Sequence, residues 1–162
     1  MTGDWLRCCR ELRLLGGGQG LTLREATLCF TRSRTHVVDE AREHSRRRMI
    51  HLSFEDFIEC LVRTGLRLPV PTDEEIREAG CADAAEFVLQ LRDNDEAHSK
   101  FAAEAATRPA QPPGRCVEHL LAVITRTVKA ATAVGTKDTR LTERELKVYH
   151  SKLADESSAV AQ

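Results

Sequence analysis

Five helix-starting sequences constrain the fold of this chain more than any other feature. In each, a Thr, Ser or Asp is followed three residues later by Glu or Asp, the spacing at which two side chains satisfy free backbone N–H groups of a first helical turn. Apolar residues at three- and four-residue intervals then follow, as on one face of an amphipathic helix. The pairs are Thr22 with Glu25, Ser53 with Asp56, Thr72 with Glu75, Asp83 with Glu86, and Thr142 with Glu145. We therefore predict an all-α protein.

The composition supports this fold class. Aromatic residues make up only 4% of the 162 residues, whereas 41% are hydrophobic and 30% are charged, so the core must be aliphatic. That balance is ordinary for helical proteins and poor for a β-sandwich, in which aromatic and β-branched residues are plentiful. The length suits one compact domain with extensions.

Glycine and proline mark the boundaries between the expected segments. The glycine-rich run 16–20 ends a first helix over 4–15, and Gly65 with the following prolines ends the helix that starts at Ser53. The stretch RPAQPPG at 108–114 is the clearest linker. We therefore divide the chain into a paired helical unit over 1–67, an acidic helical extension over 68–107, this linker, and C-terminal helices over 115–162.

Several functional classes lack the sequence features that they require. Residues 64–107 carry 10 acidic and 4 basic side chains, so a sustained basic field for nucleic acid is missing. No stretch approaches 18 consecutive apolar residues and the N-terminus lacks a signal-peptide pattern, so we expect a soluble intracellular protein that binds no membrane. The six cysteines form no C-x-x-C pair, the histidines are scattered, and enzyme motifs are absent. These features predict reduced thiols, no metal site, no cofactor and no enzymatic activity.

The two capped helices nearest the N-terminus share the register of an EF-hand, a calcium-binding helix–loop–helix. In an EF-hand, oxygens at positions 1, 3, 5, 7, 9 and 12 of a twelve-residue loop hold the ion. Leu21 at position 8 places Glu25 at position 12, and Leu52 at position 8 of a second loop places Asp56 at position 12. The back halves of both loops therefore match the EF-hand pattern.

The front halves of both loops lack oxygen ligands. Ca²⁺ requires several carboxylate or carbonyl oxygens at about 2.3–2.6 Å, and the arginines at 46–48 would repel the ion. Positions 1, 3 and 5 are Leu14, Gly16 and Gly18 in the first loop, and Ser45, Arg47 and Met49 in the second. We therefore predict an EF-hand-like paired helix–loop–helix domain that does not bind calcium, followed by short helices and a C-terminal helical extension.

Three motifs carry a resemblance to a known family. They are DWLRCCRELRLL in the first expected helix, LT..EA...F in the second and I.LSFEDFIECL in the fourth. These motifs resemble the degenerate EF-hand domain of the tubulin polymerization-promoting protein family, and they are similar to EF-hand-like segments of axonemal proteins. The resemblance covers about residues 4–65. It implies a microtubule-associated structural role without catalysis, tubulin or other axonemal proteins as partners, and a place in the cytoplasm and cytoskeleton, in the axoneme of a cilium or flagellum.

Two sets of residues are candidates for contact with a partner. Arg42, Arg46, Arg47 and Arg48, with Arg32 and Arg34 nearby, form a basic cluster that fits an acidic surface such as that of tubulin; the alternative is a solvated loop. Leu120, Leu121, Ile124 and Val128 form an apolar stripe that either docks on a partner or folds back on the N-terminal unit. We favour docking, because the linker at 108–114 can extend the last third of the chain away from the core.

The sequence therefore favours a non-enzymatic structural or scaffold subunit within a larger assembly, with a calcium-insensitive EF-hand-like fold. The alternative is a calcium-regulated EF-hand sensor or adaptor that binds a target helix in its cleft. A calcium titration by calorimetry distinguishes the two, because only the sensor requires a calcium site.

Overall fold

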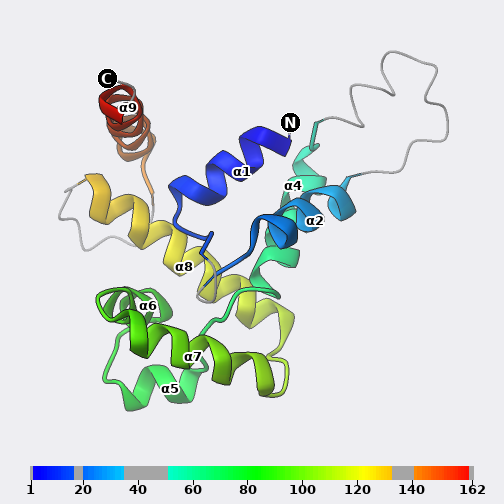
Figure 1. The fold of residues 1–162 in the computed structure, drawn as a ribbon, viewed down its shortest axis with the longest axis vertical. Helices are drawn as coiled ribbons and strands as arrows, with labels where there is room; N and C mark the ends of the chain where they lie inside the picture. Colours follow the sequence, from blue (N-terminus) through cyan, green and yellow to red (C-terminus); the bar gives the residue numbers. More distant parts are fainter. Residues whose placement is uncertain (1, 17–19, 35–50, 133–140, 161–162) are drawn as a thin grey trace.

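The computed structural model describes residues 2–16, 20–34, 51–132 and 141–160, and these residues form helices joined by short turns (Figure 1). The predicted all-α class is confirmed. Within the described ranges the β structure is limited to a single bridge between Leu15 and Leu21. The helices are α1 (Thr2–Glu11), α2 (Leu23–Ser33), α4 (Phe54–Gly65), α5 (Asp73–Glu78), α6 (Ala84–Arg92), α7 (Asp95–Thr107), α8 (Pro113–Thr132) and α9 (Glu143–Val160).

All five predicted helix starts carry the expected caps. At the start of α2, the Thr22 hydroxyl accepts from the Glu25 N–H at 3.1 Å, and the Glu25 carboxylate accepts from the Thr22 N–H at 2.9 Å. The same reciprocal pair begins α4, α5 and α9, and Asp83 caps α6. Each cap satisfies backbone donors that have no partner inside the helix, which contributes about 1 kcal/mol.

The main core lies where α1, α2 and α4 meet α8. Trp5 on α1 is buried and its indole N–H donates to the Ala26 carbonyl of α2 at 2.9 Å, which joins the first two helices. Leu120 of α8 is 1% exposed and packs into the same cluster. The buried members are Trp5, Cys9, Leu14, Leu21, Ala26, Cys29, Phe30, Cys60 and Leu120. Helix α8 is therefore an integral part of the N-terminal core.

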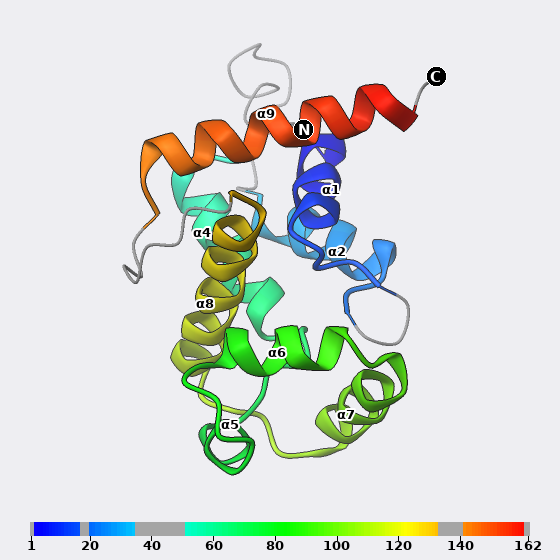
Figure 2. The same cartoon turned by 90° about the vertical axis from the view of Figure 1, so that its left-hand side faces the viewer.

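Helix α8 also packs against α6, in the middle of the chain. Val123 of α8 packs on Ala85 and Val88 of α6, and Phe87 of α6 meets Phe101 of α7 edge to face, with ring centroids 5.3 Å apart. Figure 2 shows α6 crossing α8, with α5 and α7 beyond it. Helix α8 thus contributes to two hydrophobic clusters, with Leu120 in the main core and Val123 in the cluster with α6.

The connection between α7 and α8 is bound to the rest of the protein. The Arg108 guanidinium forms an ion pair with Glu75, and the Gln111 side-chain amide donates to the Val70 carbonyl at 3.0 Å. Its proline-rich sequence led us to expect an extended linker that carries the last third of the chain away from the core. That expectation is wrong, because these polar contacts and the apolar face of α8 hold the connection against α5 and the segment that precedes it.

Candidate functional site

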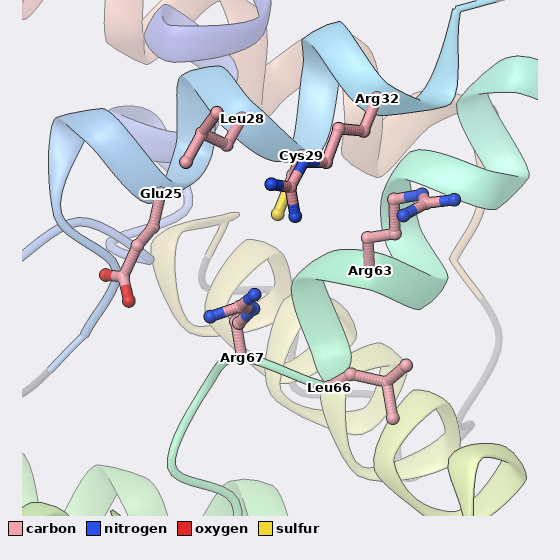
Figure 3. A pocket seen from close by; sticks show the side chains of 7 residues that line it. All are labelled: Glu25, Leu28, Cys29, Arg32, Arg63, Leu66 and Arg67. Atoms are coloured by element: carbon pink, nitrogen blue, oxygen red, sulfur yellow. The ribbon is translucent and has the colours of Figure 1, made fainter.

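Helices α2 and α4 pack closely, because their facing residues are small. Ala26 and Cys60 are fully buried, and Thr64 near the end of α4 is buried as well. The outer rims of the two helices carry longer side chains and enclose a cavity of about 190 Å³. Its lining residues are Glu25, Leu28, Cys29, Arg32, Arg63, Leu66 and Arg67 (Figure 3). We call this cavity the α2–α4 groove.

Arginines from both sides reach into the α2–α4 groove. Figure 3 shows Arg32 extending from α2 and Arg67 extending from the turn after α4 into the space between the helices. Arg63 forms an ion pair with Glu59 one turn earlier, at 2.7 Å, and its Nε is buried without a hydrogen-bond partner. Arg32 and Arg67 form no ion pair with any residue that the structure describes. The groove therefore holds more positive charge than its own carboxylates neutralise.

Glu25 is the single carboxylate among the lining residues, and its oxygens already have partners. The pKa of its carboxyl lies below the ordinary value, because the Thr22 backbone N–H and hydroxyl donate to it and the nearby Arg67 charge favours the anion. At neutral pH it is ionised and held at the start of α2. Guanidinium groups bind carboxylate and phosphate oxygens through paired N–H donors, so the groove has the chemistry to hold an acidic group of a ligand.

Cys29 is the one thiol that lines the α2–α4 groove. Burial raises its pKa above the ordinary value, and this outweighs the nearby Thr64 hydroxyl and arginine charges, which favour the thiolate. A thiol becomes an effective nucleophile only as the thiolate. The chemistry available in the groove is therefore binding through charge and apolar contact, with Leu28 and Leu66 at its edges.

The two ends of the connection between α1 and α2 are joined by backbone hydrogen bonds. The Leu21 N–H donates to the Leu14 carbonyl at 2.9 Å, and the Gly16 N–H donates to the Leu21 carbonyl at 3.2 Å. A side chain at Gly20 would lie 2.7 Å from the Leu14 carbonyl oxygen, so the loop passes close to itself. Among the residues that the structure describes, no three His, Cys, Asp or Glu side chains gather in a group that could hold a metal ion.

The predicted partner-binding residues have different positions. Arg42, Arg46, Arg47 and Arg48 lie outside the described residues. Leu120 and Val128 are 1% and 2% exposed and Ile124 packs against the main core, whereas Leu121 is 45% exposed. Leu120, Ile124 and Val128 therefore pack on the protein itself, so the expectation that they dock on a partner is wrong.

Sequence reasoning missed Arg63 and Arg67. It grouped Arg32 with the arginines that follow it in the chain, but the fold places Arg32 beside a groove that Arg63 and Arg67 line as well. The spacing of Arg63 and Arg67 put both on one side of the end of α4, which was a usable signal. Nothing local to the sequence showed that this side would face Arg32 on α2.

None of the described helices is long and apolar enough to cross a membrane. Comparison with family models, with curated proteins and with solved structures found no match for this chain.

Proposed function

We propose that this protein is a non-enzymatic scaffold subunit that docks an acidic protein surface in the α2–α4 groove. The observation that carries the proposal is that Arg32, Arg63 and Arg67 line one groove whose single lining carboxylate is Glu25. The oxygens of Glu25 already accept from Thr22, so the arginines outnumber the acceptors that the groove itself supplies. Apolar Leu28 and Leu66 lie beside them and are partly exposed. Charged groups with an apolar rim favour a protein partner, because the charges select the partner and the apolar contact adds affinity.

The N-terminal half is best interpreted as a degenerate EF-hand pair. Leu21 and Leu52, the residues at the eighth position of each proposed loop, belong to one hydrophobic cluster, as the pairing of two such units requires. Thr22 with Glu25, and Ser53 with Asp56, use the last positions of the loops as helix caps. Under this interpretation the fold is a calcium-insensitive support for the groove.

The proposed partner is the microtubule or another protein of a ciliary or flagellar axoneme. The support for this choice is the resemblance of residues 4–65 to microtubule-associated EF-hand-like domains, together with the charge of the groove. The acidic surface of tubulin supplies carboxylates, which guanidinium groups bind. The proposal therefore places the protein in the cytoskeleton as one part of a larger assembly.

Microtubule co-sedimentation tests the proposal. We expect the wild-type protein to pellet with microtubules, and the double variant Arg32→Gln/Arg67→Gln to lose most of this binding. The matched control is Arg24→Gln/Arg77→Gln, which removes the same charge at two exposed positions outside the groove. Equal pelleting of the two double variants would exclude the groove as the docking site.

Calcium calorimetry tests the rival interpretation, a calcium-regulated sensor. A scaffold of the proposed kind releases or absorbs no binding heat when calcium is added to the purified protein, because the loops lack oxygen ligands at their leading positions. A saturable signal that disappears in Glu25→Gln would favour the sensor instead.

A further inference from the structure

A second basic cavity lies on a different part of the molecule. It has a volume of about 550 Å³ and is lined by residues of α1, α6, α8 and α9. In Figure 2, α9 crosses above α1 and the end of α8, and α6 lies on the opposite side of this space. Its cationic residues are Arg10, Arg13, Arg92 and Lys152. We call it the α1–α9 cavity; it shares no lining residue with the α2–α4 groove.

The cations of this cavity have neutral partners or none. The Arg92 guanidinium donates to the Arg13 carbonyl at 3.1 Å and to the Thr127 hydroxyl at 3.4 Å, and the Lys152 amine donates to the Ala131 carbonyl at 2.6 Å. In the described part of the chain, none of the four forms an ion pair with a carboxylate. These bonds fix the direction of the side chains and leave their charges uncompensated.

One carboxylate, Glu11, also lines the cavity, and it interacts with Arg7 at 3.8 Å. The cavity is therefore lined by four cations and one carboxylate, and that carboxylate already interacts with Arg7, which is not one of the four. Burial lowers the pKa of Arg92 below its ordinary value, and the positive charge of Arg13 lowers it further. The arginines thus repel one another at close range, and an anion between them would remove that cost.

The backbone at Arg13 is unusual. Its φ is 54°, in the left-handed region that residues with a side chain rarely adopt. The Arg13 N–H donates to the Arg10 carbonyl, and Arg92 holds the Arg13 carbonyl, so the turn after α1 is fixed from both sides. An adjoining cavity of about 330 Å³ is lined by the same three arginines and by the buried His98. The Leu14 N–H donates to the Cys9 carbonyl at 2.8 Å, so Arg13 occupies the left-handed position of the C-terminal cap of α1, which sets where its side chain leaves the helix end.

We infer that the α1–α9 cavity binds a small molecule that carries two or more phosphate groups. Its volume lies within the range of about 300–1,000 Å³ that is typical of small-molecule sites. Guanidinium groups pair with phosphate oxygens through two N–H donors, and Lys contributes a compact charge. The four cations come from α1, the turn after it, α6 and α9, and a single anion contacts only a few of them. The ligand therefore needs two or more phosphate groups. The surrounding helices favour a compact ligand over an extended acidic peptide.

Calorimetry on the full-length chain at low salt tests this inference, with inorganic tripolyphosphate as the first probe. ATP and inositol hexakisphosphate are the second and third probes, and they distinguish a nucleotide from a polyol phosphate as the source of the phosphates. We expect tripolyphosphate to bind with an affinity that falls as salt is added. Tighter binding of one organic probe identifies the part of the ligand that the remaining cavity wall contacts.

The variant Arg10→Gln/Arg13→Gly removes two cations and keeps the fold, because glycine adopts the left-handed backbone at position 13 without strain. We expect its affinity for tripolyphosphate to fall about tenfold or more, because two charge-assisted contacts are lost. Arg24→Gln/Arg77→Gln, which removes the same charge at two exposed positions outside both cavities, serves as the control and is expected to bind as the wild type does. If none of the three probes binds, or if both double variants lose the same affinity, the inference is wrong. Microtubule binding by the α2–α4 groove can fail or succeed independently of this result.

Discussion

Replacing Leu120 with alanine tests whether α8 belongs to the core. Leu120 is 1% exposed and lies among residues of α1, α2 and α4, whereas its neighbour Leu121 is 45% exposed. The two substitutions remove the same atoms from adjacent positions of one helix. Any difference in their effect therefore reports burial, since helix propensity and side-chain chemistry are matched.

The expected magnitude follows from the burial of the two side chains. Leu→Ala at a fully buried site loses transfer free energy and leaves a cavity, which together cost about 2–5 kcal/mol. We expect Leu120→Ala to lower the free energy of unfolding by about 3 kcal/mol, and the melting temperature by about 6–12 °C for a chain of this length. Leu121→Ala, which loses only part of a solvated contact, should cost less than about 1 kcal/mol.

Urea denaturation, followed by circular dichroism and by tryptophan fluorescence, measures both variants. Trp5 is the only tryptophan of the chain, is 5% exposed, and belongs to the same cluster as Leu120, so its emission reports on this core directly. A loss for Leu120→Ala that is no larger than that for Leu121→Ala would refute the packing of α8 on the N-terminal helices. It would restore the interpretation in which the stripe on α8 awaits a partner.

Three further predictions concern the loop, the acid limit of stability and the thiols. Gly20→Ala should destabilise the protein by about 1–3 kcal/mol in urea denaturation, because the added carbon meets a backbone oxygen at 2.7 Å; Gly3→Ala, with nothing within 4 Å, should not. Burial alone would raise the pKa of Glu75, but hydrogen bonds from Thr72 and Arg108 outweigh it and lower the pKa. The stability that this carboxylate provides is therefore present above its unfolded pKa and lost as the pH falls through the folded pKa. Glu75→Gln should reduce stability at neutral pH and make the melting temperature less dependent on pH on the acid side. An unchanged dependence of melting temperature on pH would contradict this. Burial raises the pKa of Cys60 to about 12, and Cys81 is the more accessible thiol, so mass spectrometry after brief alkylation of the native protein should find Cys81 modified before Cys60; the reverse order would contradict the packing of α4.

The positions of the helix starts could be predicted because capping is a local interaction. A side chain three residues away either satisfies the first-turn donors or does not, and no distant residue is needed. The pairs at Thr22, Ser53, Thr72, Asp83 and Thr142 were therefore correct. The ends were less accurate: we expected the first helix over 4–15, and α1 ends at Glu11.

The environment of α8 could not be predicted in the same way. Its apolar spacing showed that Leu120, Ile124 and Val128 share a face, but a hydrophobic face carries no information about what covers it. The proline-rich stretch before it was typical of an extended linker. The ion pair of Arg108 with Glu75, which binds that stretch to the start of α5, joins residues 33 positions apart.

The α2–α4 groove and the α1–α9 cavity could not be predicted from the sequence for the same reason. Arg32 comes from α2 and Arg67 from the turn after α4, and Arg13, Arg92 and Lys152 come from three distant parts of the chain. Their charges are visible in the sequence, but charge becomes a binding site only where side chains converge without counter-ions.

The sequence by itself determined the all-α class and the places where helices begin, since each of these depends on residues a few positions apart. Only the tertiary structure decided that α8 completes the core and that arginines from separate helices face common cavities. The physical reason is range: caps and amphipathic spacing act within one or two helical turns, whereas burial and charge convergence depend on which surfaces the folded chain brings together.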